Sequence, residues 1–174
     1  SVGAAYIFQK DQGGVDNWGE VKKLLAREGL SRDNFGNSVA ISNDLVAVGF
    51  YNKDEAPAYL FQRDQGGTNN WGEVKRFEGV PDNNATYVAL YGDTVLVGMP
   101  YTHGDVNEDG KIDCSPTFEG DECYVGSVSV FRQNEGGINN FGLVKRFVAA
   151  DGARGAELGY ALALDDKTII VSAR

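Results

Sequence analysis

An acidic stretch at residues 105–113 carries the side chains most suited to chemistry, because their oxygen atoms recur at alternate positions. Asp105, Asn107 and Asp109 stand at its first, third and fifth positions, and Asp113 stands at the ninth. Calcium takes six to eight oxygen ligands, and alternate residues of a tight turn can aim their oxygens at one point. The spacing therefore predicts a calcium site.

The remaining positions of this stretch refine the prediction. Gly110 at the sixth position permits a sharp bend, and Lys111 at the seventh would contribute its backbone carbonyl. The twelfth position holds Pro116 rather than a bidentate glutamate, so the loop is not a standard EF-hand, and an acid within 119–122 could add an oxygen. A solvated acidic loop is the alternative, and magnesium suits such a flexible cage poorly. We expect a structural ion that orders a long insertion.

Two cysteines flank the later part of this insertion. Cys114 directly follows the acidic stretch, and Cys123 precedes a strand-like run at 124–132. A disulfide between them would clamp the neck of the insertion in an oxidising compartment, and two reduced thiols are the alternative. A zinc site fits less well, because two cysteines and the single His103 make an incomplete ligand set.

Two further features bear on modification and catalysis. Asn84 begins an Asn-Ala-Thr triplet, which is a glycosylation sequon, although such triplets also arise by chance. An enzyme needs a nucleophile, a base and an electrophile stabiliser that converge. His103 reads as an ordinary loop residue, and the sequence holds no Gly-x-Ser-x-Gly motif or phosphate-cradling glycine loop before a helix. We expect no catalytic activity.

Composition narrows the class of protein. The chain has 174 residues, which suits one domain, and a formal net charge of −9. That charge argues against a nucleic-acid surface and against electrostatic docking to an anionic membrane. No stretch approaches the roughly 20 apolar residues that span a bilayer. With 23 glycines and only 4 prolines, the composition is typical of a turn-rich β protein.

The elements that must position these residues come from an internal repeat. Three units lie at about 1–54, 55–101 and 123–174, and an insertion at 102–122 carries the acidic stretch. Each unit contains four runs rich in β-forming residues, separated by Gly, Asn and Asp. The runs are 5–9, 58–62 and 128–132; 17–22, 70–75 and 140–145; 36–41, 85–90 and 159–164; and 45–49, 94–98 and 168–172.

Four strands in about 50 residues is the period of a β-propeller blade. The Val- and Ala-rich runs suit inner strands buried on both faces, whereas Trp-Gly-Glu-Val-Lys alternates as an outer strand should. Residues 21–30 alone would also fit an amphipathic helix, but the repeat overrides that interpretation. The repeated aromatic residues Trp18, Trp71 and Phe141 could line a binding rim, although packing between blades is the commoner role.

These runs resemble the FG-GAP repeat, in which a Phe-Gly run such as 35–40 and a Val-Ala-Val-Gly run such as 46–49 recur. That family builds the seven-bladed propeller heads of integrin α subunits and many secreted surface proteins. The acidic stretch looks like the nine-residue calcium loops of integrin propellers, which Asp113 would close. It falls between the second and third strands of a blade, whereas family loops join the first two. Units two and three replace Phe-Gly by Asn84-Ala85 and Leu158-Gly159.

In the family the Phe-Gly run is the innermost strand and the Trp run the outermost. That order implies an all-β chain of four-stranded antiparallel blades, with two complete blades and a third split between the two ends of the sequence. Three blades' worth of strands leaves edges open, since propellers usually close with four to eight. We expect either a segment of a longer six- or seven-bladed chain, or several copies that complete the split blade between them.

The resemblance implies a non-catalytic, calcium-stabilised propeller segment of an extracellular or cell-surface protein. Such a segment would act in adhesion or surface assembly, and its partners would be other protein chains or the missing blades, without nucleic acid and without insertion into a membrane. A carbohydrate-binding propeller, with glycans as partners, is the first alternative. An accessory propeller of a secreted hydrolase is the second.

Overall fold

The structure is a computed structural model that describes residues 3–27, 34–51, 56–79, 85–102, 124–150 and 155–174. Within these ranges the regular elements are twelve β-strands. They are β1 (Ala5–Lys10), β2 (Trp18–Leu24), β3 (Ser38–Ser42), β4 (Leu45–Gly49), β5 (Ala58–Gln62), β6 (Gly72–Phe77), β7 (Tyr87–Tyr91), β8 (Thr94–Met99), β9 (Ser127–Gln133), β10 (Phe141–Phe147), β11 (Leu162–Leu164) and β12 (Ile169–Val171). The part of the chain that the structure describes has no helix suited to crossing a bilayer.

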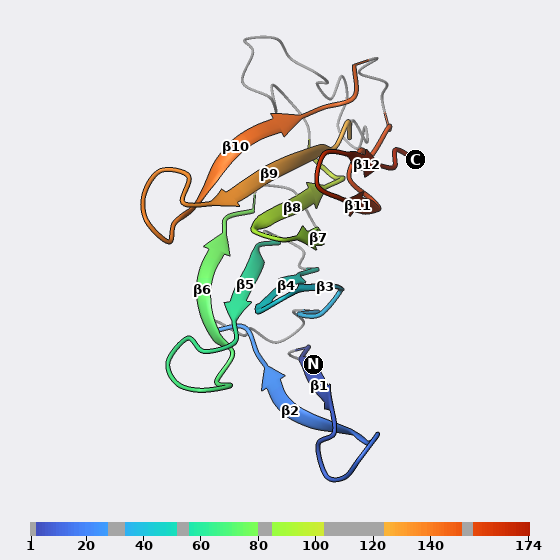
Figure 1. Ribbon diagram of the computed structural model, residues 1–174. Coiled ribbons are helices and arrows are strands. Elements are labelled where there is room, and N and C mark those ends of the chain that lie inside the picture. The colour runs from blue at the N-terminus through green and yellow to red at the C-terminus, as the bar shows by residue number, and fades with distance from the viewer. Residues whose placement is uncertain (1–2, 28–33, 52–55, 80–84, 103–123, 151–154) are drawn as a thin grey trace.

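The strands form antiparallel sheets in the order that the repeat predicts. Two four-stranded sheets run β3-β4-β5-β6 and β7-β8-β9-β10, and two-stranded sheets β1-β2 and β11-β12 lie before and after them in the chain. In Figure 1 the sheets follow one another from β1-β2, beside the N-terminus, to β11-β12, beside the C-terminus. The predicted all-β fold, with two complete blades and two half-blades, is therefore confirmed.

Apolar side chains fill the spaces between successive sheets. Because strand side chains alternate between faces, β4 sends Val46 and Val48 toward the β1-β2 sheet and Leu45 and Ala47 toward the β7–β10 sheet. A third cluster joins Leu96 and its neighbours to the β11-β12 sheet. Each four-stranded sheet is therefore buried between two others, which is how blades stack in a propeller.

Strand β3 departs from the burial predicted for inner strands. Val39 and Ile41 are 62% and 64% exposed, whereas Val88, which stands at the position of Val39 in the next repeat, is 6% exposed. The difference has a structural cause. Strand β7 packs against β3 and β4, but the β1-β2 sheet has no inner strands to cover the matching face of β3.

A glycine near the end of β4 and of β8 allows neighbouring sheets to approach closely. A Cβ atom added at Gly49 would lie 2.3 Å from the carbonyl oxygen of Thr86, and one added at Gly98 would lie 2.3 Å from that of Gly159. The neighbour in each case is backbone of the following sheet, which cannot rotate away as a side chain could. This repeated contact explains why the Val-x-Val-Gly run ends in glycine.

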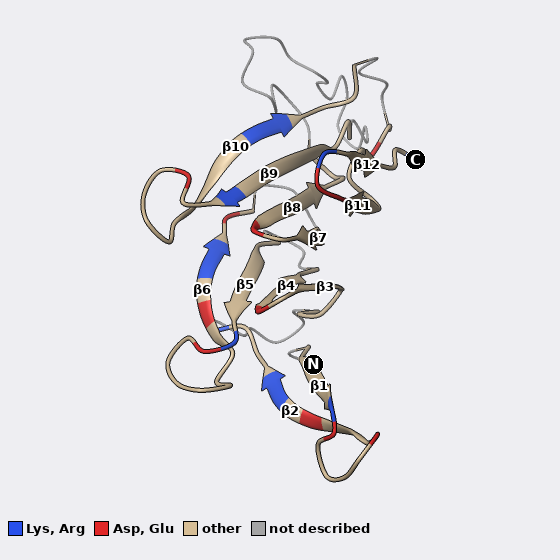
Figure 2. Ribbon diagram, in the orientation of Figure 1, with Lys and Arg blue, Asp and Glu red and all other residues tan. Residues whose placement is uncertain are grey.

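Each of the outer strands β2, β6 and β10 carries a pair of adjacent Lys or Arg residues, coloured blue in Figure 2. Their lysines also link successive sheets. Lys22 Nζ donates a hydrogen bond to Asn70 Oδ1 at 3.0 Å, and Lys75 Nζ donates to Asn140 Oδ1 at 3.2 Å. The two asparagines occupy equivalent positions in the outer hairpins of consecutive repeats, so this contact is itself part of the repeat.

Candidate functional site

The residues predicted to bind calcium lie outside the described residues. They are Asp105, Asn107, Asp109, Lys111 and Asp113. The predicted disulfide partners Cys114 and Cys123, the sequon residue Asn84 and His103 also fall outside. The described ranges contain no group of three or more His, Cys, Asp or Glu side chains able to hold a metal ion.

The chain on either side of the insertion is nevertheless described, and its two ends lie together. The carbonyl oxygen of Thr102 accepts hydrogen bonds from the N–H groups of Val125 and Gly126, each at 3.1 Å. The rings of Tyr101 and Tyr124 meet edge to face, with their centroids 5.4 Å apart. The insertion therefore leaves and re-enters the β7–β10 sheet through a narrow neck, between the second and third strands as predicted.

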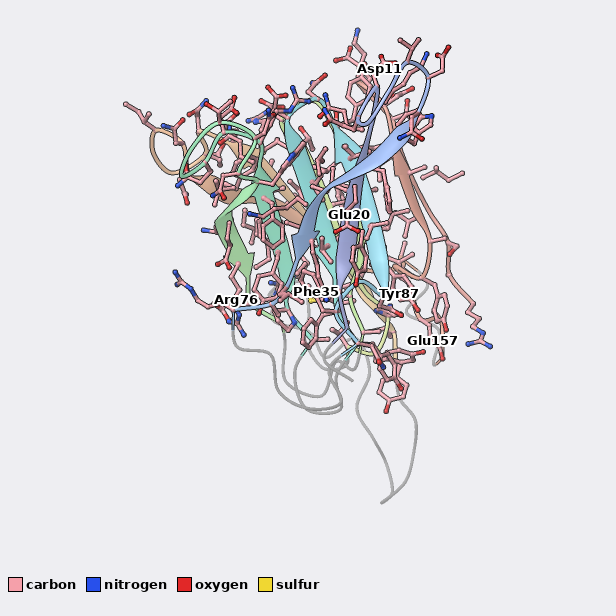
Figure 3. All side chains as sticks on the ribbon, turned by 90° about the horizontal axis from the view of Figure 1, so that it is seen from below. Asp11, Glu20, Phe35, Arg76, Tyr87 and Glu157 are labelled. Atoms are coloured by element: carbon pink, nitrogen blue, oxygen red, sulfur yellow. The ribbon has the colours of Figure 1, made fainter. Side chains whose placement is uncertain are left out.

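The neck borders a cluster of tyrosines that the sequence pattern did not reveal. The rings of Tyr87 and Tyr160 stack with centroids 5.0 Å apart, and the hydroxyl of Tyr101 lies 3.4 Å from that of Tyr160. Arg174 lies 5.2 Å from the centre of the Tyr160 ring. Figure 3 shows Tyr87 and Glu157 at the end of the sheets opposite the hairpin tip that carries Asp11. The only sequence signal is that Tyr101 and Tyr124 flank the insertion.

Electrostatics distinguish the members of this cluster. Burial raises the pKa of Tyr101 and of Tyr87, because the charged phenolate is disfavoured away from water. Hydrogen bonds with the hydroxyls of Tyr101 and Tyr87 lower the pKa of Tyr160. The cluster combines aromatic faces with hydroxyl tips.

The repeated aromatic residues at the start of the outer strands pack between blades wherever another sheet precedes their own, as predicted. Trp71 is 3% exposed in the layer between the β1-β2 and β3–β6 sheets, and Phe141 is 2% exposed in the next layer. Trp18 is 64% exposed, because the described chain has no sheet before β1-β2. These residues therefore pack between blades, and Trp18 marks a face without its neighbour.

An open apolar groove runs beside that face. It has a volume of about 270 Å³ and lies between β1 and the exposed face of β3 and β4. Tyr6 and Phe8 of β1 and Val39 and Ile41 of β3 line it. Tyr6 and Phe8 are 48% and 53% exposed, whereas their equivalents in β5 are almost fully buried. The groove is therefore the place that two inner strands would fill in a complete sheet.

Stacked four-stranded antiparallel sheets, with an aromatic residue at the start of each outer strand, define blades of the β-propeller type. A family model described as FG-GAP repeat matches residues 18–61, which span β2 to β5. The resemblance to the FG-GAP repeat is therefore confirmed over that part of the chain, and the other units repeat its strand order. No curated protein matches this sequence.

Proposed function

We propose that this chain is a non-catalytic, calcium-stabilised propeller segment of an extracellular or cell-surface protein, and that it acts through contacts with other protein chains. FG-GAP repeats form propeller domains that are often found in extracellular adhesion proteins, which supports the location and the class of function. Protein partners, rather than nucleic acid or a membrane, also agree with the net charge of −9.

The exposed apolar face around β1 carries this proposal. Tyr6, Phe8 and Trp18 are exposed on the β1-β2 sheet, and Tyr6 and Phe8 line the groove together with the exposed Val39 and Ile41 of β3. Soluble proteins rarely expose contiguous apolar patches of this kind unless the patch binds something. The strand edge beside it offers unpaired backbone groups, so the partner that fits best is a protein that adds β-strands.

The calcium assignment rests on the donor set of the insertion. The side chains of Asp105, Asn107 and Asp109, the carboxylate of Asp113 and the backbone carbonyl of Lys111 are oxygen ligands, which calcium prefers. The neck at Thr102 holds the two ends of the insertion together, so a bound ion would order the segment between them. When bound, calcium would supply charge neutralisation and cross-linking of this acidic loop.

Thermal unfolding with and without calcium tests the metal site. We expect added calcium chloride to raise the melting temperature of the chain, and an equal concentration of magnesium chloride to raise it less. The double variant Asp105→Ala, Asp109→Ala should lose the calcium response, whereas Asp166→Ala, in the exposed β11-β12 turn, should keep it. An unchanged response in the double variant would refute the assignment.

Carbohydrate binding is the second candidate, and the tyrosine cluster favours it. The stacked rings of Tyr87 and Tyr160, with the Tyr101 hydroxyl beside that of Tyr160, suit ligands that have both apolar and hydroxyl faces. A glycan array performed with calcium present tests this function. Selective binding that Tyr160→Ala abolishes, while Tyr91→Ala at the exposed end of β7 leaves it intact, would favour the lectin. An array without selective binding would exclude it.

A further inference from the structure

A polar cleft lies between the outer hairpins of two successive sheets, β5-β6 and β9-β10. It has a volume of about 470 Å³, and in Figure 1 the turns of the two hairpins lie on the same side of the molecule. Gln62, Gln65 and Gln133 line the cleft together with Glu73 and Asn139. Ligand pockets usually enclose about 300–1,000 Å³, so the cleft is large enough for a small ligand.

The polar side chains that line this cleft are not used elsewhere in the described protein. Gln62, Glu73 and Gln133 are half-buried, and Gln65 is exposed. Within the described residues none of these four side chains makes a hydrogen bond or an ion pair. Polar groups that are partly withdrawn from water are usually paired. Amides and a carboxylate that converge without partners on one cleft therefore indicate a site for groups from outside the chain.

The preceding pair of sheets shows what covers the equivalent place there. Gln133 pairs with Phe141 across the β9-β10 hairpin, and Arg63 accepts a hydrogen bond from Trp71 at the same point of the β5-β6 hairpin. The Arg63 guanidinium lies 5.3 Å from the centre of the Trp71 ring, and one of its nitrogens is 3.0 Å from an Asp44 carboxylate oxygen. The long arginine covers its aromatic neighbour, whereas the shorter Gln133 leaves a cleft that Phe141 lines.

The other polar residues of the cleft recur in the preceding repeat with their types unchanged. The residues at the positions of Gln62, Gln65, Glu73 and Asn139 are Gln9, Gln12, Glu20 and Asn69. The third unit departs from this set, since Arg132 and Leu143 stand at the positions of Gln62 and Glu73. Two spaces between sheets therefore share one set of amides and a carboxylate, and they differ in whether an arginine stands beside it.

The chemistry of this lining selects a class of ligand. A primary amide offers two donors and an acceptor, and a carboxylate accepts several hydrogen bonds. Each hydroxyl of a sugar ring both donates and accepts, and one carboxylate can accept from two adjacent hydroxyls. Successive N–H groups of an extended peptide point to opposite sides, so they suit one carboxylate less well. The charge of Glu73 disfavours an anion, and the described residues contain no group of side chains that could hold a metal ion.

We propose that this amide cleft binds one ring of a neutral saccharide. The Glu73 carboxylate accepts hydrogen bonds from two adjacent hydroxyls, and the amides of Gln62, Gln65 and Gln133 donate to and accept from the others. The site shares no residue with the tyrosine cluster. It rests on the carbohydrate-binding candidate only for the class of ligand, and it gives that class a different place on the molecule.

Side-chain amide signals in magnetic resonance spectra test the site, because the lining residues carry NH₂ groups. We expect at least one of glucose, galactose and mannose, titrated into the isotope-labelled chain with calcium present, to shift the signals of Gln133 and Asn139. Gln133→Arg should weaken this binding by more than about tenfold, since it places at the cleft the side chain that Arg63 supplies one repeat earlier. Thr68→Arg, in the exposed turn of the β5-β6 hairpin, is the matched control and should bind as wild type does.

The reverse substitution, Arg63→Gln, should create a second site. With the arginine removed, the equivalent residues one repeat earlier become accessible, and the same hexose should also shift the signals of Gln9 and Gln12. Dispersed backbone amide signals identify variants that have kept their fold, as the presence of arginine at the equivalent position leads us to expect for Gln133→Arg. A folded Arg63→Gln chain without new shifts would contradict the role assigned to the amide set.

Three further results would overturn the proposal. One is that none of the three hexoses shifts the side-chain amide signals up to the high millimolar range. The second is that folded Gln133→Arg binds as tightly as Thr68→Arg. The third is that acetyl-triglycine amide shifts these signals and the hexoses do not, which would assign the cleft to a peptide. Tyr160→Ala should leave the shifts unchanged, so the cleft and the tyrosine cluster fail separately, and neither result bears on the calcium-dependent melting shift.

Discussion

Replacing Phe77 by alanine tests whether apolar layers between sheets hold this fold together. The Phe77 side chain is 2% exposed and lies in the layer between the β3–β6 and β7–β10 sheets, against Phe131. Burying a phenylalanine contributes about 1.5–3 kcal/mol by transfer from water, and truncation also leaves a cavity. Loss of the aromatic pair adds about 0.5–1.5 kcal/mol. We therefore expect unfolding free energy to fall by about 3–5 kcal/mol.

In a chain of this length each kcal/mol shifts the melting temperature by about 2–4 °C, so the expected decrease is on the order of 10 °C. Differential scanning calorimetry at one fixed protein concentration measures it, because association would otherwise change the apparent stability. Ile138→Ala is the control, since that side chain is 91% exposed and should cost under about 0.5 kcal/mol. A Phe77→Ala variant that melts together with the control would refute the layered packing.

Three further predictions concern other parts of the chain. Gly98→Ala should lower the melting temperature by several degrees, because its Cβ would lie 2.3 Å from the Gly159 carbonyl oxygen, and an unchanged melting curve would contradict that close approach. Hydrogen bonds from the N–H groups of Lys167 and Thr168 lower the pKa of Asp165 below its usual value. The ionised Asp165 carboxylate therefore stabilises the folded state above about pH 4, and this stabilisation is lost as the pH falls through the pKa that Asp165 has in the folded protein. The melting temperatures of wild type and Asp165→Ala should therefore differ at neutral pH and converge in acid; a difference that grows in acid would contradict this sign. If Cys114 and Cys123 pair, the non-reduced intact mass should be two hydrogens below the reduced mass, and equal masses would exclude the disulfide.

The strand order of this protein could be predicted from sequence because the repeat supplies information that single segments lack. Residues 21–30 alone fit an amphipathic helix, yet Trp18–Leu24 is a strand, as its equivalents at 70–75 and 140–145 indicate. Local propensity is weak, and pairing with β1 outweighs it. The packing of the repeated aromatic residues could be predicted in the same way, because a residue that recurs at the start of each outer strand has the same neighbours in each complete blade.

The exposed groove and the tyrosine cluster could not be predicted from the sequence, because they depend on how the sheets are placed relative to one another. A run such as 38–42 has the composition of a buried strand, but the burial of Val39 depends on whether another sheet covers it. Tyr87, Tyr101 and Tyr160 come from different loops and strand ends, whose meeting depends on how far each sheet rotates from the last. Periodicity reports the faces of one strand, and it carries no information on how successive sheets are placed.

The departures from the repeat are more informative about function than the repeat itself. Where the sheets are complete, Phe61, Val88 and Trp71 are buried and their contacts are satisfied within the chain. Phe8 and Trp18 have the same residue types at equivalent positions but remain exposed. Their exposure therefore reflects a missing neighbour, since a surface adapted to water would not need the same aromatic residues. The same reasoning applies to Phe147 of β10, which is 38% exposed although its equivalent Phe77 of β6 is 2% exposed.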